Sequence, residues 1–454
     1  MSVISDKLTY REILIIALPM VASQASETSM LFFDRLFLSR VNITVMSAAL
    51  SGGISNFVFQ SFFIGLIGYI NALVAQFYGA GKLQSGLQTL SQGIILSFIA
   101  WPIIVAAIPI VRLTFILAGH TPEQIAYEYL YVRILMAGSI FTLLRTAFSS
   151  YFIGIGKTNL VFIANVTGVL INIPLNYVLI FGKFGFPALG LRGAAYATLF
   201  SIIIINGILF IFYLRSHGYK MNKHNRLWSF DKEIFIKLIK FGAPAGGNLF
   251  LNIMAFNIGL QFLHSYGAEV AAAVTITLNY DQVVFIPMLG LGAATTSIVG
   301  RYMGAKKPQT ARKAGFMSWK ISLIYGGVMI LIFLFGAEAL VNLFAAQFKD
   351  VGNEYLKLSR TMLRLASIYI LADMTQLIFA SALRGAGDTH WVMRVSVLIH
   401  WFYAISVIVF VRLVKIPPIS TWLLFIIFVI CLGCAMSSRY IKGKWQSISV
   451  IEHN

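Results

Sequence analysis

The sequence predicts an all-α polytopic membrane protein with about twelve transmembrane helices in two six-helix lobes. Only 11% of the 454 residues are charged, 58% are hydrophobic and the mean hydropathy is +0.82, whereas soluble domains carry about 25% charged residues. The apolar residues gather in runs of the length that crosses a bilayer, for which about 20 residues suffice. Motifs of the first half also recur in the second half.

The apolar runs fall into two groups of six. The first group comprises residues 13–38, 46–77, 90–111, 129–152, 160–181 and 190–214. The second group comprises residues 234–263, 270–299, 315–335, 362–383, 392–411 and 421–440. We therefore expect an N-lobe over residues 1–214, a basic linker over 215–233, and a C-lobe with a short tail over 234–454.

Positive charge is concentrated in alternate connectors. One side receives Lys82, Lys157, the 215–233 linker, the 301–313 loop, Arg384 and the tail with Arg439, Lys442 and Lys444. The opposite side is sparser, with Lys183, Arg412 and Lys415. The positive-inside rule then makes the first side cytoplasmic, with both termini inside. The net charge of +19 is explained by this topology and by contact with anionic lipid, so nucleic-acid binding is not expected.

The two halves repeat each other in order. VAQFYGAGK at 74–82 matches VGRYMGAKK at 299–307, and Pro19 matches Pro244, both 225 positions apart. GIGKT at 154–158 matches GAGDT at 385–389, 231 positions apart. Because six is an even number of helices, both halves begin on the same side of the membrane. The repeats should therefore be parallel, related by a pseudo-two-fold axis along the membrane normal, with a cavity between them.

Carboxylates inside the apolar runs are the first candidate functional residues. These acids are Glu27, Asp34, Asp281 and Asp373. A charge at the bilayer centre costs on the order of 2.5–3.5 kcal/mol on insertion scales, so such a group faces a protein interior or a watery cavity. Glu27 and Asp34 are seven residues apart and share one helical face. Each acid either binds a cation or pairs with a base of the fold, and Arg133 and Arg145 are available as partners.

Polar oxygen atoms at membrane depth occur in NIPLNYVLI. Asn172 and Asn176 are four residues apart and share a face, and Pro174 between them frees backbone groups. Amide oxygens together with one carboxylate and a threonine suit a monovalent cation or a hydrogen-bonded proton site. Helix–helix hydrogen bonding is the alternative interpretation.

Enzymatic signatures are not met. GIGKT resembles part of a phosphate-binding loop, but Tyr151 stands where the first glycine of that motif is required. No HExxH occurs and no GxSxG stands out, so neither an enzyme nor a cofactor is expected.

Five stretches carry more specific patterns: ALP…FFD at 17–34, VAQFYGAG at 74–81, NIPLNYVLIFGKFG…LGLRGAAYAT at 172–198, SIYILADMTQ at 367–376 and ALRGAGDT at 382–389. In these stretches the sequence resembles the MATE (multidrug and toxic compound extrusion) family, nearest its bacterial NorM-type branch. The resemblance covers nearly the whole chain. It implies a cation-coupled exporter of bulky, often cationic organic compounds in the bacterial inner membrane.

The resemblance also implies site residues. Asp34 matches the acid of the family's first helix, which forms an N-lobe cation site with the positions of Asn172, Asn176 and Thr198. Asp373 and Tyr369 match the acid and the aromatic residue of a C-lobe site.

Two positions depart from the family's patterns. The NorM-type glutamate of the seventh helix aligns with Asn252, and archaeal-type members carry an acid at the position of Asn176. Glu27 and Asn252 are 225 positions apart, so we expect Glu27 to relocate part of the missing charge across the pseudo-axis, and Asp281 to be a further cavity charge. The coupling ion is H⁺ or Na⁺, with Na⁺ expected at Asp34, Asn172, Asn176 and Thr198.

The mechanism expected from these features is rocker-switch antiport by a chain that acts as a monomer by default. Its partners would be small organic substrates and membrane lipid. A flippase for lipid-linked oligosaccharides, of the same superfamily, is an alternative, but such proteins tend to line the cavity with arginines. An exporter of one metabolite is a further alternative, whereas a passive channel is disfavoured by the repeat.

Overall fold

The computed structural model describes residues 8–217, 229–344 and 354–451, and every regular element in these ranges is a helix. The helices of the first half are α1 (Tyr10–Ser39), α2 (Ile43–Gly68), α3 (Ile70–Gly79), α4 (Leu83–Ala106), α5 (Ile108–Leu117), α6 (Pro122–Ala137), α7 (Ser139–Gly154), α8 (Thr158–Phe181) and α9 (Leu191–His217). Those of the second half are α10 (Lys232–His264), α11 (Ala268–Gly304), α12 (Pro308–Phe344), α13 (Glu354–Ala386), α14 (Thr389–Val409) and α15 (Pro418–Lys442). A π-helical turn, η3 (Phe410–Val414), follows α14, and a 3₁₀ turn, η4 (Lys444–Ser447), follows α15.

The number of membrane spans agrees with the prediction. Eleven helices of the described residues are long and apolar enough to cross a bilayer, and α6 and α7 together make up to twelve. These two helices are bent by 47° at Gly138, where an added Cβ would lie 2.3 Å from the side chain of Leu199. The predicted run 129–152 is therefore divided between two helices, α6 and α7.

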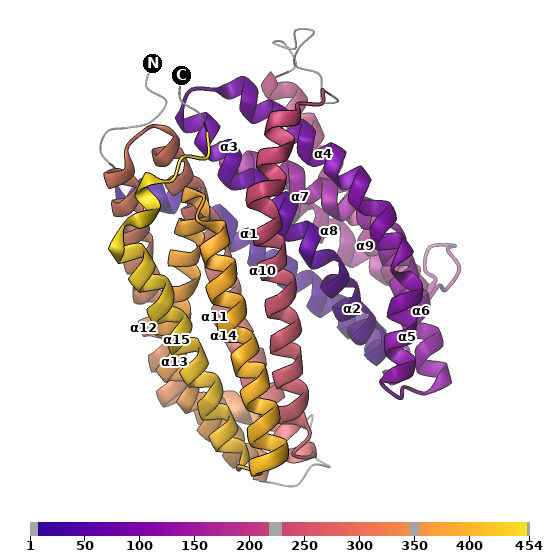
Figure 1. The fold of residues 1–454 in the computed structure, drawn as a ribbon. Coiled ribbons are helices and arrows are strands. Elements are labelled where there is room, and N and C mark those ends of the chain that lie inside the picture. Colours follow the sequence, from indigo (N-terminus) through magenta and orange to yellow (C-terminus); the bar gives the residue numbers. More distant parts are fainter. Residues whose placement is uncertain (1–7, 218–228, 345–353, 452–454) are drawn as a thin grey trace.

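The two largest hydrophobic cores of the described residues show the division into lobes. One core is built mainly from α2–α9 and the other mainly from α11–α15, which lie on opposite sides in Figure 1. The N-terminal part of α1 packs in the core of the second half, and that of α10 packs in the core of the first half. Ile13 belongs to the core of the second half and Leu238 to the core of the first half. These two residues are 225 positions apart, so the crossover follows the sequence repeat.

The lobes meet along a tightly packed seam made by α3 and α11. A Cβ added to Gly79 would lie 1.9 Å from the carbonyl oxygen of Arg301, and one added to Gly304 would lie 1.9 Å from that of Gln76. The Asn71 amide donates across the seam to the carbonyl oxygen of Ala293 at 3.0 Å. Only glycine allows the two backbones to approach this closely.

The seam lies at one end of the molecule, which we call the seam end. From there the two lobes diverge toward the opposite, splayed end (Figure 1). The expected linker 215–233 joins the lobes at the seam end, but its residues 218–228 lie outside the described residues.

The segment after α15 also bridges the lobes. The indole of Trp445 is fully buried, stacks on Tyr440 at 4.8 Å and donates to the carbonyl oxygen of Tyr440 at 2.9 Å. A few residues later Val450 and Ile451 are buried in the core of the first half. The tail, residues 444–451, is thus anchored in one lobe and inserted into the other.

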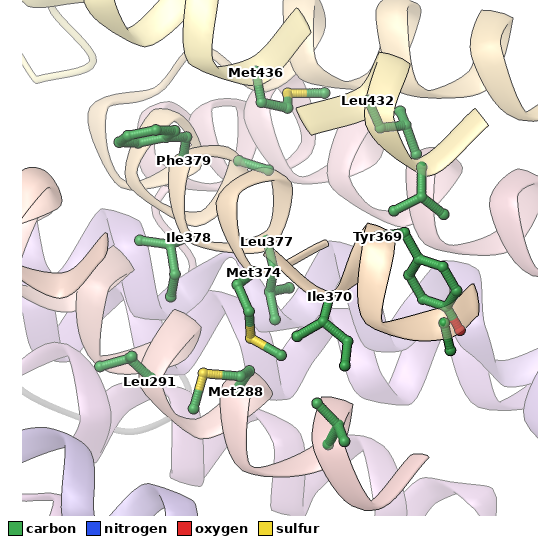
Figure 2. Packing of buried hydrophobic residues seen from close by; sticks show 14 of the residues in the cluster. Met288, Leu291, Tyr369, Ile370, Met374, Leu377, Ile378, Phe379, Leu432 and Met436 are labelled. Carbon is green, nitrogen blue, oxygen red and sulfur yellow. The ribbon is translucent and has the colours of Figure 1, made fainter. Parts of the chain in front are cut away.

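Methionine contributes to the core of the second half. Figure 2 shows Met288 and Leu291 of α11 opposite Met374 of α13, and Leu432 and Met436 of α15 on another side of α13. Methionine adapts to irregular gaps because its thioether chain is unbranched and flexible. Tyr369 lies at the edge of this core, which places its hydroxyl beside the polar groups described below.

Candidate functional site

The polar residues predicted for the N-lobe lie together between α1, α8 and α9. Asp34 is only 6% exposed, and Asn172 and Asn176 are fully buried. The Asn176 amide donates to the Asp34 carboxylate and to Oδ1 of Asn172, the latter at 2.7 Å. The hydroxyl of Thr198 on α9 donates to the carbonyl oxygen of Ala194 at 3.0 Å and lies near the Asp34 carboxylate. The structure therefore brings all four residues into one cluster, the N-lobe cluster.

The local structure explains how the N-lobe cluster forms. Asn172 and Asn176 are one turn apart on α8, which packs against both α1 and α9. Asn176 Oδ1 and Asn172 Nδ2 are buried and have no hydrogen-bond partner among the described residues. A buried amide oxygen without a donor, next to a carboxylate, is a ready ligand for a hard cation. One carboxylate with neutral oxygens matches the charge of a monovalent ion, whereas Ca²⁺ takes six to eight oxygen ligands and usually several carboxylates.

Glu27 lies in a second polar group, which sequence reasoning did not assemble. Arg145 of α7 donates to both carboxylate oxygens of Glu27, at 3.1 and 3.4 Å. Asn165 of α8 donates to Glu27 at 3.0 Å and to the hydroxyl of Ser23 at 2.6 Å. Glu27 is thus paired with Arg145, which is one of the two interpretations that the sequence left open for this acid.

Helical spacing in the sequence connects two members of this group, Ser23 and Asn165, with predicted site residues. Ser23 precedes Glu27 by four residues and Asn165 precedes Asn172 by seven, so each shares a helical face with a residue already selected.

The acids of the C-lobe gather between α11 and α13. The Tyr369 hydroxyl donates to Oδ1 of Asp281 at 2.8 Å. Asp373 lies one helical turn after Tyr369 on α13 and accepts from the Gln376 amide at 3.3 Å. Asp281, Tyr369 and Asp373 form the C-lobe cluster, in which Asp281 is a central member and not an additional charge elsewhere.

Asn252 is not part of the C-lobe cluster. Its amide donates to Asn248 at 2.7 Å and to Ser396 at 2.8 Å, and hydrogen bonds of the described residues do not join it to Asp373 or Tyr369. Asn248 and Asn252 are the repeat equivalents of Ser23 and Glu27, 225 positions apart. Both lobes thus keep a polar group at this place, with an ion pair in the first lobe and neutral side chains in the second.

A membrane protein with two repeated lobes, a tight seam at one end, a buried carboxylate in the first lobe and half-buried carboxylates in the second has the architecture of a secondary transporter. The family model MatE matches residues 19–178 and 244–409, two blocks that begin 225 positions apart. The chain therefore belongs to the MATE family, and it is a multi-pass membrane transporter and not an enzyme.

Relatives and solved structures agree with this assignment. The chain is similar to the probable multidrug resistance protein NorM of Thermotoga maritima, with 28% identity covering 97% of this chain and 94% of the relative. It is also similar to YoeA of Bacillus subtilis, a probable multidrug resistance protein, with 26% identity covering 81% and 79%. A solved outward-facing multidrug resistance MATE transporter of the MOP superfamily superposes with a TM-score of 0.85, at 19% identity and 96% coverage of both chains. That last likeness concerns the fold.

Proposed function

We propose that this transporter is a cation-coupled antiporter, driven by H⁺ or Na⁺, that exports bulky and often cationic organic compounds. The observation that carries the proposal is the N-lobe cluster, where a buried carboxylate is surrounded by amide and hydroxyl oxygens. The names of the relatives from Thermotoga maritima and Bacillus subtilis support multidrug export.

The coupling rests on competition for buried negative charge. A proton or Na⁺ at Asp34 neutralises the carboxylate, with Asn172, Asn176 and Thr198 as its neutral partners. In the C-lobe, Asp281 and Asp373 provide the attraction for the cationic group of a substrate. Glu27 takes no part in this exchange, because Arg145 holds both of its oxygens.

The seam defines the alternating states. Lysine and arginine flank the seam end, so we assign that end to the cytoplasm and place the chain in the bacterial inner membrane with both termini inside. The lobes are 1–214 and 234–454, joined by 215–233, and a single chain suffices. With the seam closed, the site is reached from the splayed end. Export then requires the seam to open by a rocker-switch motion of the lobes.

Efflux of a fluorescent cationic dye from proteoliposomes tests the proposal. A Na⁺ gradient and a pH gradient are imposed separately, on the unaltered chain and on the isosteric variant Asp34→Asn. Glu354→Gln is the control, because it removes an exposed carboxylate from the first turn of α13. We expect efflux under at least one gradient, its loss in Asp34→Asn and its retention in the control.

Each outcome has a definite meaning. Efflux driven by Na⁺ alone makes the N-lobe cluster an oxygen cage for the metal ion, and efflux driven by pH alone makes Asp34 a proton carrier. Active extrusion by Asp34→Asn would remove Asp34 from the coupling step. Failure under both gradients would favour a dedicated metabolite exporter or a lipid flippase.

A further inference from the structure

Three arginines from different helices converge on one cavity outside both clusters. Arg112 of α5, Arg133 of α6 and Arg192 of α9 line a cavity of about 480 Å³. Its other lining residues are aromatic, aliphatic or proline: Pro122, Ile125, Ala126, Tyr127, Tyr129 and Leu130. The lining thus contains three guanidinium groups and no carboxylate.

These arginines have no acidic partner in the described part of the chain. The guanidinium of Arg112 lies over the ring of Tyr129 at 5.4 Å, and no ion pair involves any of the three. The buried acid of α6, Glu128, has other partners. It binds His120 at 2.9 Å, Gln124 at 3.0 Å and the hydroxyl of Ser51. Their positive charge is therefore available to a ligand.

The cavity lies at the splayed end on the outer flank of the N-lobe. There α5 and α6 lie far from the second half of the chain (Figure 1), and α6 packs against α2 and α9. The neighbouring face of α5 exposes apolar side chains, Ile110, Leu113, Ile116 and Leu117. A face of this kind on a membrane helix is covered by lipid. The three arginines also lie on the side of the membrane that the positive-inside rule leaves poor in cations, so topology does not account for them.

We propose that this cavity, the arginine pocket, binds the headgroup of an anionic phospholipid from the surrounding bilayer. Guanidinium groups bind phosphate oxygens through paired, charge-assisted hydrogen bonds, and arginine is the residue best suited to phosphate recognition. Tyr127 and Tyr129 fit the interfacial level of a headgroup, where tyrosine is enriched. The acyl chains lie along the exposed apolar face of α5.

Lipid titration of the full-length protein in detergent, followed by native mass spectrometry, tests the arginine pocket. Phosphatidylglycerol is compared with phosphatidylcholine of the same acyl chains. The test variant carries Arg112→Gln, Arg133→Gln and Arg192→Gln together. The control variant carries Lys183→Gln, Arg412→Gln and Lys415→Gln, which removes three exposed cations from the same end of the molecule.

We expect the unaltered chain and the control to retain phosphatidylglycerol in preference to phosphatidylcholine. The test variant should bind phosphatidylglycerol about 100-fold more weakly, the loss expected for three basic groups near an anionic lipid. Thermal unfolding of each variant in lipid-free detergent establishes that the comparison is made on folded protein, and the three single variants replace the triple if it does not fold.

Three results would overturn the proposal. Equal retention of both lipids would show that the phosphate charge is not recognised. An equal loss of phosphatidylglycerol binding in the control variant would show that binding depends only on the net charge of the protein. Complete displacement of phosphatidylglycerol by inorganic phosphate alone would identify the pocket as a site for free phosphate and not for a lipid.

Discussion

At Asp34 a single carboxylate depends on groups from two other helices. The Asn176 amide donates to it from α8 and also holds Asn172, while Thr198 lies near it on α9. Such a shared arrangement fixes the orientation of each oxygen. A small movement of α1 relative to α8 therefore changes how well the N-lobe cluster holds a cation.

The ion pair of Glu27 and Arg145 should be structural. Arg145→Ala leaves the half-buried Glu27 carboxylate without its partner, and we expect a loss of about 1–3 kcal/mol in the free energy of unfolding. The double variant Glu27→Gln with Arg145→Gln should lose less, because it leaves no unpaired charge. Thermal unfolding in detergent measures both. A double variant less stable than Arg145→Ala would contradict the assignment.

Tyr369→Phe should affect transport more than folding. It removes the hydroxyl that donates to Asp281, while the ring remains in the core. The loss of one hydrogen bond lowers the free energy of unfolding by about 1 kcal/mol. We expect a several-fold change in the dye concentration for half-maximal efflux and little change in melting temperature. Tyr403→Phe, at another buried tyrosine of the same lobe, is the control. Equal effects at both positions would exclude a special role for the Asp281 contact.

Sequence spacing predicted some polar residues and could not predict the partners of others. Asn172 and Asn176 share a face of one helix, so their proximity follows from helical geometry. Glu27 and Arg145 are 118 residues apart, and their contact depends on how α1 packs against α7 and α8. Contacts between residues so far apart in the sequence are determined by tertiary packing, and no local pattern of a single sequence indicates them.

At the scale of the helix, glycine positions control the closure of the seam. Gly304→Ala places a methyl group where the carbonyl oxygen of Gln76 now lies, so α3 and α11 must separate. We expect this variant to favour the state that is open at the seam end. Gly207→Ala is the matched control, since an added Cβ there meets nothing within 4 Å.

Alkylation of a cysteine in the seam measures that shift. Ser297 is fully buried and donates to the carbonyl oxygen of Ile153 at 2.6 Å, so Ser297→Cys reports on seam opening in a background with Cys431→Ser and Cys434→Ser. Its labelling rate should rise several-fold with Gly304→Ala and stay unchanged with Gly207→Ala. Equal rates in the two variants would show that the seam tolerates the methyl group.

Helix existence was predictable from the apolar runs, but helix ends and breaks were not. The predicted run 315–335 lies inside α12, Pro308–Phe344, because the helix continues past the apolar part of the sequence. The run 90–111 is divided at Ala107 into α4 and α5. Hydropathy indicates which residues lie within the membrane, but it does not indicate where a helix ends or where its backbone breaks. Both differences arise for this reason.

For the whole molecule, the tail, residues 444–451, should stabilise the closed seam. Val450→Ala with Ile451→Ala removes apolar side chains from the core of the first half, where truncation of a buried aliphatic side chain costs about 1–5 kcal/mol. We expect faster labelling of Ser297→Cys in this variant. Ile419→Ala, at an exposed isoleucine near the start of α15, is the control. An unchanged labelling rate in the tail variant would show that the tail plays no part in closure.

The seam also bears on the origin of the repeat. Gly79 contacts Arg301 while Gly304 contacts Gln76, and the two pairs exchange under the shift of 225 positions. A contact in which i meets j and j meets i is the mark of an isologous interface between identical subunits. A six-helix ancestor with one copy of this motif would therefore make the same contact with a second copy of itself. Gene duplication and fusion would convert that homodimer into one chain, after which the halves were free to acquire an ion pair on one side and neutral amides on the other.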